Sequence, residues 1–147
     1  LCDGRADMTE AFAKPWDERM QIAKDSGVQA LAAPTVERWF GAEFVKSHPE
    51  VAKRFIHVAS QTQLEGFIGC AKAIQNLDYL SEVSQIQVPL TLLVGANDGP
   101  LPQAMTHISE LLAHSKLEII AQAGHLPNID QSTAFNAAMM RHFFQKP

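Results

Sequence analysis

Two residues of this sequence could carry acid–base chemistry because of where they stand. Asp98 follows a short apolar run that ends in glycine, residues 88–95, and His125 follows a second run, residues 116–120. A carboxylate that accepts a hydrogen bond from an imidazole fixes the tautomer of the ring and stabilises its protonated form. A histidine that activates a serine or cysteine nucleophile needs such a partner.

Each residue taken alone also has an ordinary explanation. An aspartate in the loop of residues 96–102, which is rich in Gly and Pro, is often a turn residue or a helix cap. A single histidine after a glycine is usually a loop residue. We interpret Asp98 and His125 together as catalytic because they occur in this order, each just beyond the end of an expected strand.

The elements that must position the two residues have an α/β pattern. Residues 88–95 are nearly all apolar, which is typical of a strand buried on both faces, whereas residues 116–120 alternate and lie closer to an edge. A helix should follow each strand, the last one from Asp130 to about Gln145. Strands joined through helices pair in parallel, and neighbouring strands lie ~4.8 Å apart, so both loops should meet at one rim of the sheet.

Side chains on these two helices are expected to form the core of the segment. Met105, Ile108 and Leu112 fall on one face of the first helix. The last helix carries four large apolar side chains that we also expect in the core: Met139, Met140, Phe143 and Phe144. Two strands make a small sheet for this architecture, so the sequence predicts that part of the sheet lies outside the chain.

Residues 14–80 have a different sequence pattern, in which short segments typical of helices are separated by helix-breaking residues. Pro15, Pro34 and Pro49 are each expected in the first turn of a helix, where the missing N–H costs nothing. Gly27 and Gly41 are expected to end the first two of these helices.

Composition excludes several classes of function. With 46% apolar residues, 19% charged residues and a net charge of −4, the chain is of the ordinary globular type, and nothing favours binding of nucleic acid. No apolar run approaches the ~20 residues that span a bilayer. Cys2 and Cys70 belong to no C-x-x-C pattern, which favours free thiols and a cytoplasmic location. The remaining histidines show no metal-ligand spacing, so we expect no metal and no cofactor: His48, His57, His107, His114 and His142.

The segments around Asp98 and His125 resemble a known family. Residues 122–131, Gln-Ala-Gly-His-Leu-Pro-Asn-Ile-Asp-Gln, resemble the histidine region of the α/β-hydrolases, and residues 88–98 resemble the acid strand of that family. Three further segments, residues 37–40, 65–74 and 1–3, resemble the cap and the strand leading into it in the 3-oxoadipate enol-lactonase branch.

The resemblance implies a fold and a division of the chain. The fold class is α/β, as the C-terminal part of an α/β-hydrolase fold with a helical cap. Residues 1–13 would be the end of a core strand and the link to the cap, residues 14–82 the helical cap, and residues 83–147 the C-terminal core segment with the acid and histidine loops.

The resemblance also implies an activity. The intact protein would hydrolyse a small-molecule carboxylic ester or lactone in aromatic catabolism, with Asp98 and His125 as two members of a catalytic triad. Trp39 would line the substrate pocket or anchor the cap on the core. Two other activities use the same pair and stay open, those of a general esterase and of a cofactor-free haloperoxidase.

The nucleophile of this family stands in a G-x-S-x-G motif, and none of the eight glycines here forms one. The family order of Ser, Asp and His places the nucleophile before Leu1, so we expect the isolated chain to be inactive. Its partner would be the missing N-terminal half or a second copy. Cys70, which follows Gly66 and Gly69 in a helical pattern, is interpreted as a packing residue. A non-catalytic folding or interaction module is the alternative from a different class.

Overall fold

The structure is a computed structural model that describes residues 1–144 and divides the chain into two compact units. One unit combines residues 1–6 with the chain from Tyr79 onward, and the other comprises Asp7–Asp78. The first unit holds a small parallel sheet flanked by helices, which confirms the predicted α/β class. None of the helices within residues 1–144 combines the length and the apolar composition that crossing a bilayer requires.

The sheet unit is built around strand β1, Leu90–Gly95. It pairs in parallel with β2, Ser115–Ile120, from Leu90 opposite Ser115 to Gly95 opposite Ile120. On the other side of β1 the first residues of the chain add a parallel bridge between Cys2 and Leu93. The N–H of Leu93 donates to Leu1 O at 2.9 Å, and the N–H of Asp3 donates to Leu93 O at 2.8 Å. Three parallel segments therefore end at the same rim.

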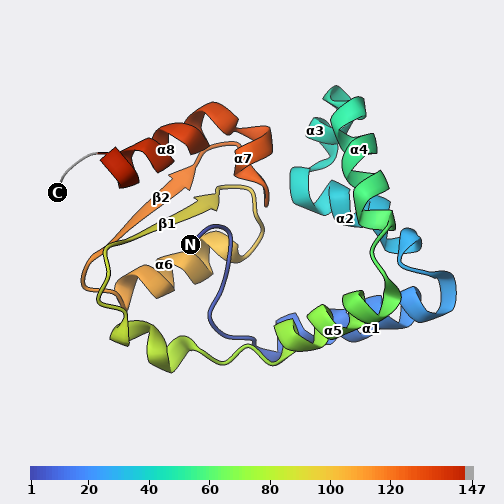
Figure 1. Cartoon of the computed structure of the whole chain (residues 1–147), viewed down its shortest axis with the longest axis horizontal. Coiled ribbons are helices and arrows are strands. Elements are labelled where there is room, and N and C mark those ends of the chain that lie inside the picture. Colours follow the sequence, from blue (N-terminus) through green and yellow to red (C-terminus); the bar gives the residue numbers. More distant parts are fainter. Residues whose placement is uncertain (145–147) are drawn as a thin grey trace. The chain divides into compact units, whose positions relative to one another are not determined.

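Helices cover both faces of this sheet (Figure 1). Helix α6, Leu101–Glu110, packs on one face, and helix α8, Ser132–Phe144, contacts the strands from the other. The predicted burial of β1 on both faces is confirmed, because each of its last four residues is buried. One core cluster joins this strand to α6 and to the short helix η1, Leu80–Gln85: Val83, Leu92, Val94, Met105, Ile108 and Leu112.

The last helical segment differs from the prediction of one helix from Asp130 to Gln145. The structure has a short helix α7, Pro127–Asp130, and a separate α8 that begins at Ser132. Pro127 lacks an N–H and therefore suits the first turn of a helix, which starts the helical backbone earlier than predicted. Gln131, with φ −132° and ψ 46°, then interrupts it. Gln145 lies outside the described residues.

Four apolar residues of α8 were expected in the core, and three of them are exposed. Met140, Phe143 and Phe144 are each more than half exposed, and the buried position of this helix is Ala138. Arg141 on α8 forms an ion pair with Glu118 on β2, so the side of the helix that faces the sheet contributes a charged side chain to this contact. The prediction for these three residues is therefore wrong.

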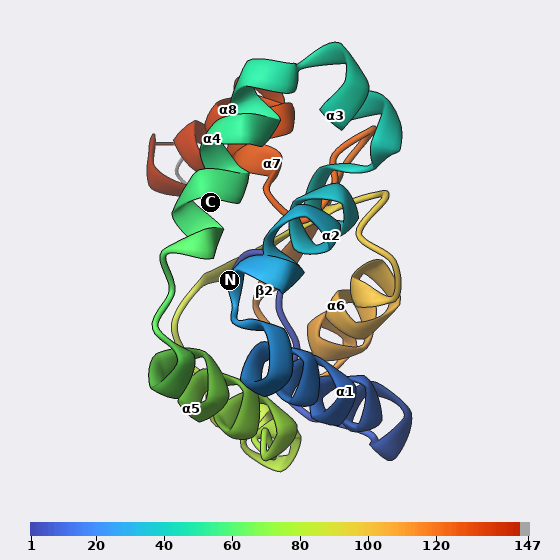
Figure 2. The same cartoon turned by 90° about the vertical axis from the view of Figure 1, so that its right-hand side faces the viewer.

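The helical unit consists of two packed pairs. Helix α1, Glu10–Ser26, lies beside α5, Leu64–Gln75, and Gln75 Nε2 donates to Ala13 O at 2.9 Å (Figure 2). Helix α2, Gln29–Phe40, packs against α4, Pro49–Ser60, with the short α3, Ala42–Ser47, between them in sequence. One core cluster joins α1 and α5 to the start of α2: Ala23, Val28 and Leu31, with Leu64 and Phe67 against them.

The prolines of this unit correct the predicted helix starts. Pro49 opens α4 as expected, but Pro15 lies inside α1 and Pro34 inside α2. Alanines occur within the four residues before each internal proline, and alanine favours the helix enough to extend it by a turn on the N-terminal side. Gly27 and Gly41 end α1 and α2 at φ +79° and +82°, which confirms them as stop signals.

We expect Gly41→Ala to destabilise the protein by about 1–3 kcal/mol, because the φ and ψ of this residue are accessible only to glycine. A Cβ at Gly41 would meet nothing within 4 Å, so the substitution tests the backbone alone. Gly66→Ala is the matched control, since it also adds a Cβ into open space but inside helix α5. It should stabilise by about 0.5–1 kcal/mol. Urea denaturation measures both, and equal effects would contradict the assignment.

Candidate active site

The ends of β1 and β2 bring Asp98 and His125 together. Asp98 lies in the turn that follows β1, and His125 lies in the loop that follows β2. His125 Nδ1 and Asp98 Oδ2 are 2.8 Å apart, so the predicted contact at the rim of the sheet is present. The Asp98 side chain is 13% exposed and the His125 side chain 34%, which leaves the imidazole as the more accessible partner. A proton on Nδ1 is then shared with the carboxylate, and Nε2 is the basic nitrogen of the neutral ring.

A close backbone approach at Gly95 makes this contact possible. The N–H of Ala96 donates to Ile120 O at 2.9 Å, and the N–H of Asn97 donates to Ala123 O at 2.8 Å, so the two loops are bonded directly. A Cβ on Gly95 would stand 2.0 Å from Gly124 O and 2.6 Å from Ala123 O. Both atoms belong to the backbone that carries His125. Only glycine at residue 95 allows the acid strand and the histidine loop to meet.

The histidine loop is further held by Asp130, a role that sequence reasoning missed. Asp130 Oδ2 accepts a hydrogen bond from the N–H of Gly124 at 2.6 Å, directly before His125. Burial raises the pKa of Asp130 above its ordinary range. The hydrogen bonds that its carboxylate accepts from backbone N–H groups, above all from Gly124, oppose this shift. The sequence placed Asp130 only at the start of a helix. The available signal for this role was that Asp130 follows Gly124, a residue of a predicted loop, by six residues.

Asp3 is the second site residue that sequence reasoning missed. Its Oδ1 accepts a hydrogen bond from the N–H of Gly95 at 2.8 Å, and its carboxyl group lies beside that of Asp98. Burial raises the pKa of Asp3 from 3.8 to about 7; the hydrogen bond from Gly95 opposes the shift, and the charge of Asp98 adds to it. The signal was present, because residues 1–3 resembled a strand end and Asp3 terminates it.

The remaining predicted residues lie in the helical unit. Trp39 is on α2 and is partly buried, and its part in substrate binding stays a prediction. Cys70 is on α5 and is an exposed free thiol, so its interpretation as a packing residue is wrong, while its helical context is confirmed. Within residues 1–144 no group of three or more His, Cys, Asp or Glu side chains could hold a metal ion.

Known proteins with similar sequences and structures are hydrolases. The chain is 30% identical over 128 residues to 3-oxoadipate enol-lactonase 2 of Acinetobacter baylyi, which covers 86% of the chain and 48% of that protein. It is 27% identical over 112 residues to the pimeloyl-[acyl-carrier protein] methyl ester esterase of Salmonella agona, covering 72% of the chain and 44% of the esterase. The crystal structure of the enol-lactonase from Burkholderia xenovorans superposes with a TM-score of 0.91 at 25% identity, over 99% of this chain and 55% of that one.

These similarities identify the class to which the chain belongs. No protein-family model matches the chain. Its relatives in sequence and in structure are nevertheless α/β-hydrolases, and the chain belongs to that superfamily. The resemblance to the enol-lactonases that the sequence suggested is thereby confirmed, since proteins of that name are among the relatives by both comparisons. The chain spans about half the length of the curated relatives that it matches.

We expect Gly95→Ala to be severely disruptive, because the added methyl group would overlap backbone oxygens that cannot rotate away. The loss should be at least about 1–3 kcal/mol, the range for overpacking a filled site. Gly69→Ala on α5 is the matched control, because its Cβ meets nothing within 4 Å. Thermal unfolding measures the stability, and the imidazole NMR signals of His125 report its displacement. A Gly95→Ala protein with unchanged stability and an unchanged His125 spectrum would refute the close approach.

Proposed function

We propose that this chain is part of an α/β-hydrolase that cleaves a small carboxylic ester or lactone, with His125 as the general base and Asp98 as the residue that orients it. The single observation that carries the proposal is the 2.8 Å contact between His125 Nδ1 and Asp98 Oδ2 at the rim of a parallel sheet. The enol-lactonase and esterase relatives support the substrate class.

The proposed chemistry follows from the geometry of the pair. A serine hydroxyl attacks the carbonyl carbon of the substrate while His125 Nε2 takes its proton, and the carbonyl oxygen takes up the negative charge. The imidazolium then gives this proton to the leaving alkoxide as the carbonyl re-forms, which leaves an acyl group on the serine. Water repeats the cycle and releases the acid. Throughout, Asp98 holds the Nδ1 proton and stabilises the imidazolium.

We propose that the nucleophile lies N-terminal to Leu1, in a G-x-S-x-G motif that is encoded in frame upstream of this sequence. Three observations support this: no glycine of the chain forms the motif, the relatives are about twice as long, and family order places Ser before Asp and His. Reading the coding sequence upstream of Leu1 tests the proposal directly. An open reading frame without the motif would favour a non-catalytic module.

The cytoplasmic location that the cysteines suggested stays a prediction.

Activity should depend on joining this chain to the upstream segment. We expect the isolated chain to hydrolyse neither an activated ester nor an enol-lactone above background, because the covalent route needs the serine. The longer protein should be active and lose about 10⁴-fold or more in kcat with His125→Ala, and about 10⁴-fold with Asp98→Asn. His107→Ala is the matched control, since His107 is exposed on α6 beside Glu110. Initial-rate assays measure all five proteins.

Two results would contradict this proposal in different ways. Hydrolysis by the isolated chain that disappears in His125→Ala would place the nucleophile within it, with the exposed thiol of Cys70 as the first suspect. A longer protein that folds but is inert would favour the non-catalytic alternative. In the active protein, Trp39→Ala should lower the rate on a lactone more than on a simple ester if Trp39 contacts the substrate, and equally on both if it only packs.

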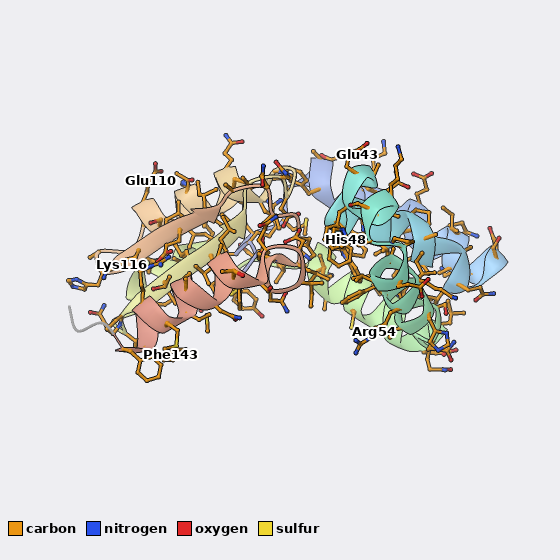
Figure 3. All side chains as sticks on the ribbon, turned by 90° about the horizontal axis from the view of Figure 1, so that it is seen from above. Glu43, His48, Arg54, Glu110, Lys116 and Phe143 are labelled. Atoms are coloured by element: carbon orange, nitrogen blue, oxygen red, sulfur yellow. The ribbon has the colours of Figure 1, made fainter. Side chains whose placement is uncertain are left out.

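We propose further that α8 carries an interaction face for the rest of the same protein, which in the isolated chain is used for self-association. Met140, Phe143 and Phe144 fall on one side of this helix at spacings of three and four residues, and all three are exposed. Figure 3 shows Phe143 projecting away from the sheet unit at the end of the helix. Exposed apolar side chains gathered in this way mark interaction surfaces.

Sedimentation velocity at tens of micromolar should therefore detect self-association of the isolated chain. The double variant Phe143→Ser and Phe144→Ser should reduce it, because serine removes the apolar area that association buries. Val58→Ser on α4 is the control, since Val58 is similarly exposed but lies on a different helix. A stable monomer, or an equal effect of both changes, would count against this interaction face.

A further inference from the structure

Asp3 presents an unusual arrangement of hydrogen-bonding atoms. Its Oδ1 accepts the N–H of Gly95 at 2.8 Å, whereas its Oδ2 is fully buried and has no hydrogen-bond donor among the described residues. A buried carboxylate oxygen without a donor costs about 1–3 kcal/mol or more, so such an atom calls for an explanation. The backbone at Asp3 is also held at φ +40°, a conformation that non-glycine residues adopt rarely and that aspartate and asparagine tolerate best.

The neighbour of this carboxyl group is a second carboxyl group. Asp98 lies within hydrogen-bonding reach of Asp3, and Asp98 Oδ2 already accepts from His125 Nδ1 at 2.8 Å. Two ionised carboxylates offer only acceptors to each other and repel. One proton between them converts the repulsion into a hydrogen bond and satisfies the buried oxygen of Asp3.

We infer that Asp3 and Asp98 share one proton, and that Asp3 is thereby a positioning residue that sets the charge presented to His125. With the proton on Asp3, its O–H donates to Asp98 and draws part of the negative charge away from the imidazole. When the proton leaves, a second negative charge stands beside His125 and increases the affinity of the ring for a proton. The titrations of Asp3 and His125 are then coupled.

The surrounding charges agree with this assignment. The pKa of Asp3 is raised to about 7, chiefly by burial; the hydrogen bond from Gly95 and the charge of His125 oppose the shift, and the charge of Asp98 contributes to it. Burial also raises the pKa of the Cys2 thiol next to it, which keeps the thiol neutral through this range. From helix α7, Asp130 adds a third carboxyl group, whose Oδ2 accepts the N–H of Gly124.

The inference predicts a pH dependence of stability. The folded state binds the Asp3 proton more tightly than the unfolded state, in which the carboxyl titrates near 3.8. The stabilisation is therefore complete below about pH 4 and is lost as the pH rises through about 7. Asp3→Asn should flatten this slope, because an amide keeps the acceptor for Gly95 and a donor for Asp98 but cannot ionise. Asp3→Ala should destabilise at every pH, since it leaves the N–H of Gly95 without its acceptor.

The decisive experiment is NMR titration of this chain, which needs no hydrolysis. The carboxyl carbon of Asp3 should titrate near 7 in the wild type and lower in Asp98→Asn. His125 should titrate in two steps in the wild type, and in a single step about one unit lower in Asp3→Asn. Glu110→Gln, an exposed carboxyl at the end of α6, is the matched control and should leave both titrations unchanged. An Asp3 carboxyl that titrates near 4, or identical His125 curves in wild type and Asp3→Asn, would overturn the inference.

The part of this inference that concerns catalysis rests on the proposed function, and the two fail separately. In the active longer protein, Asp3→Asn should shift the acidic limb of the pH–rate profile to lower pH by about one unit. Coupled titrations in a protein that hydrolyses nothing would contradict the proposed hydrolase function and support the shared proton. Uncoupled titrations in an active protein would contradict the shared proton and support the hydrolase function.

Discussion

The arrangement of the sheet unit depends on one close contact, the approach of the Gly95 backbone to residues 123–124. Three parallel segments end here, and each contributes a residue of the site: Asp3, Asp98 and His125. Gly95 donates its N–H to the first, precedes the second by three residues, and lies against the backbone that carries the third. A side chain at this position would push the strand that leads to Asp98 away from the backbone that carries His125. The position of the chemistry is therefore fixed by a residue that has no functional group.

This contact concentrates charge in a place that solvates it poorly. Three carboxyl groups and one imidazole lie near the ends of the strands, and burial raises the pKa of two of these carboxyl groups, those of Asp3 and Asp130. Backbone N–H groups compensate in part, because Gly95 donates to Asp3 and Gly124 donates to Asp130. These hydrogen bonds also make the carboxyl groups structural, since each holds one of the two loops. The backbone N–H groups do not cancel the repulsion between the carboxylates of Asp3 and Asp98, and a proton shared between these two groups removes it.

The sequence was informative wherever a local rule decided the outcome. An apolar run ending in glycine predicted β1, and positive φ at Gly27 and Gly41 agreed with their reading as stop signals. Local rules misplaced the starts of α1 and α2, because flanking alanines outweighed the tendency of proline to open a helix. They also failed at Phe143 and Phe144, whose burial depends on which surface is available to cover them. Asp98 and His125 were found from their strand ends, whereas Asp3 and Asp130 were missed, because their hydrogen bonds to Gly95 and Gly124 exist only in the folded chain.

The two units divide the proposed function in a way that bears on specificity. An aspartate–histidine pair acts on the proton of a nucleophile and is indifferent to the rest of the substrate, so esterases and lactonases can share it. Discrimination between a lactone and an open ester must come from groups that contact the substrate away from the carbonyl carbon. In this chain the sheet unit carries the pair and its charge balance, and the helical unit carries Trp39. The proposed role of Trp39 therefore predicts that changes in residues 7–78 alter substrate choice while the geometry set by Gly95 stays the same.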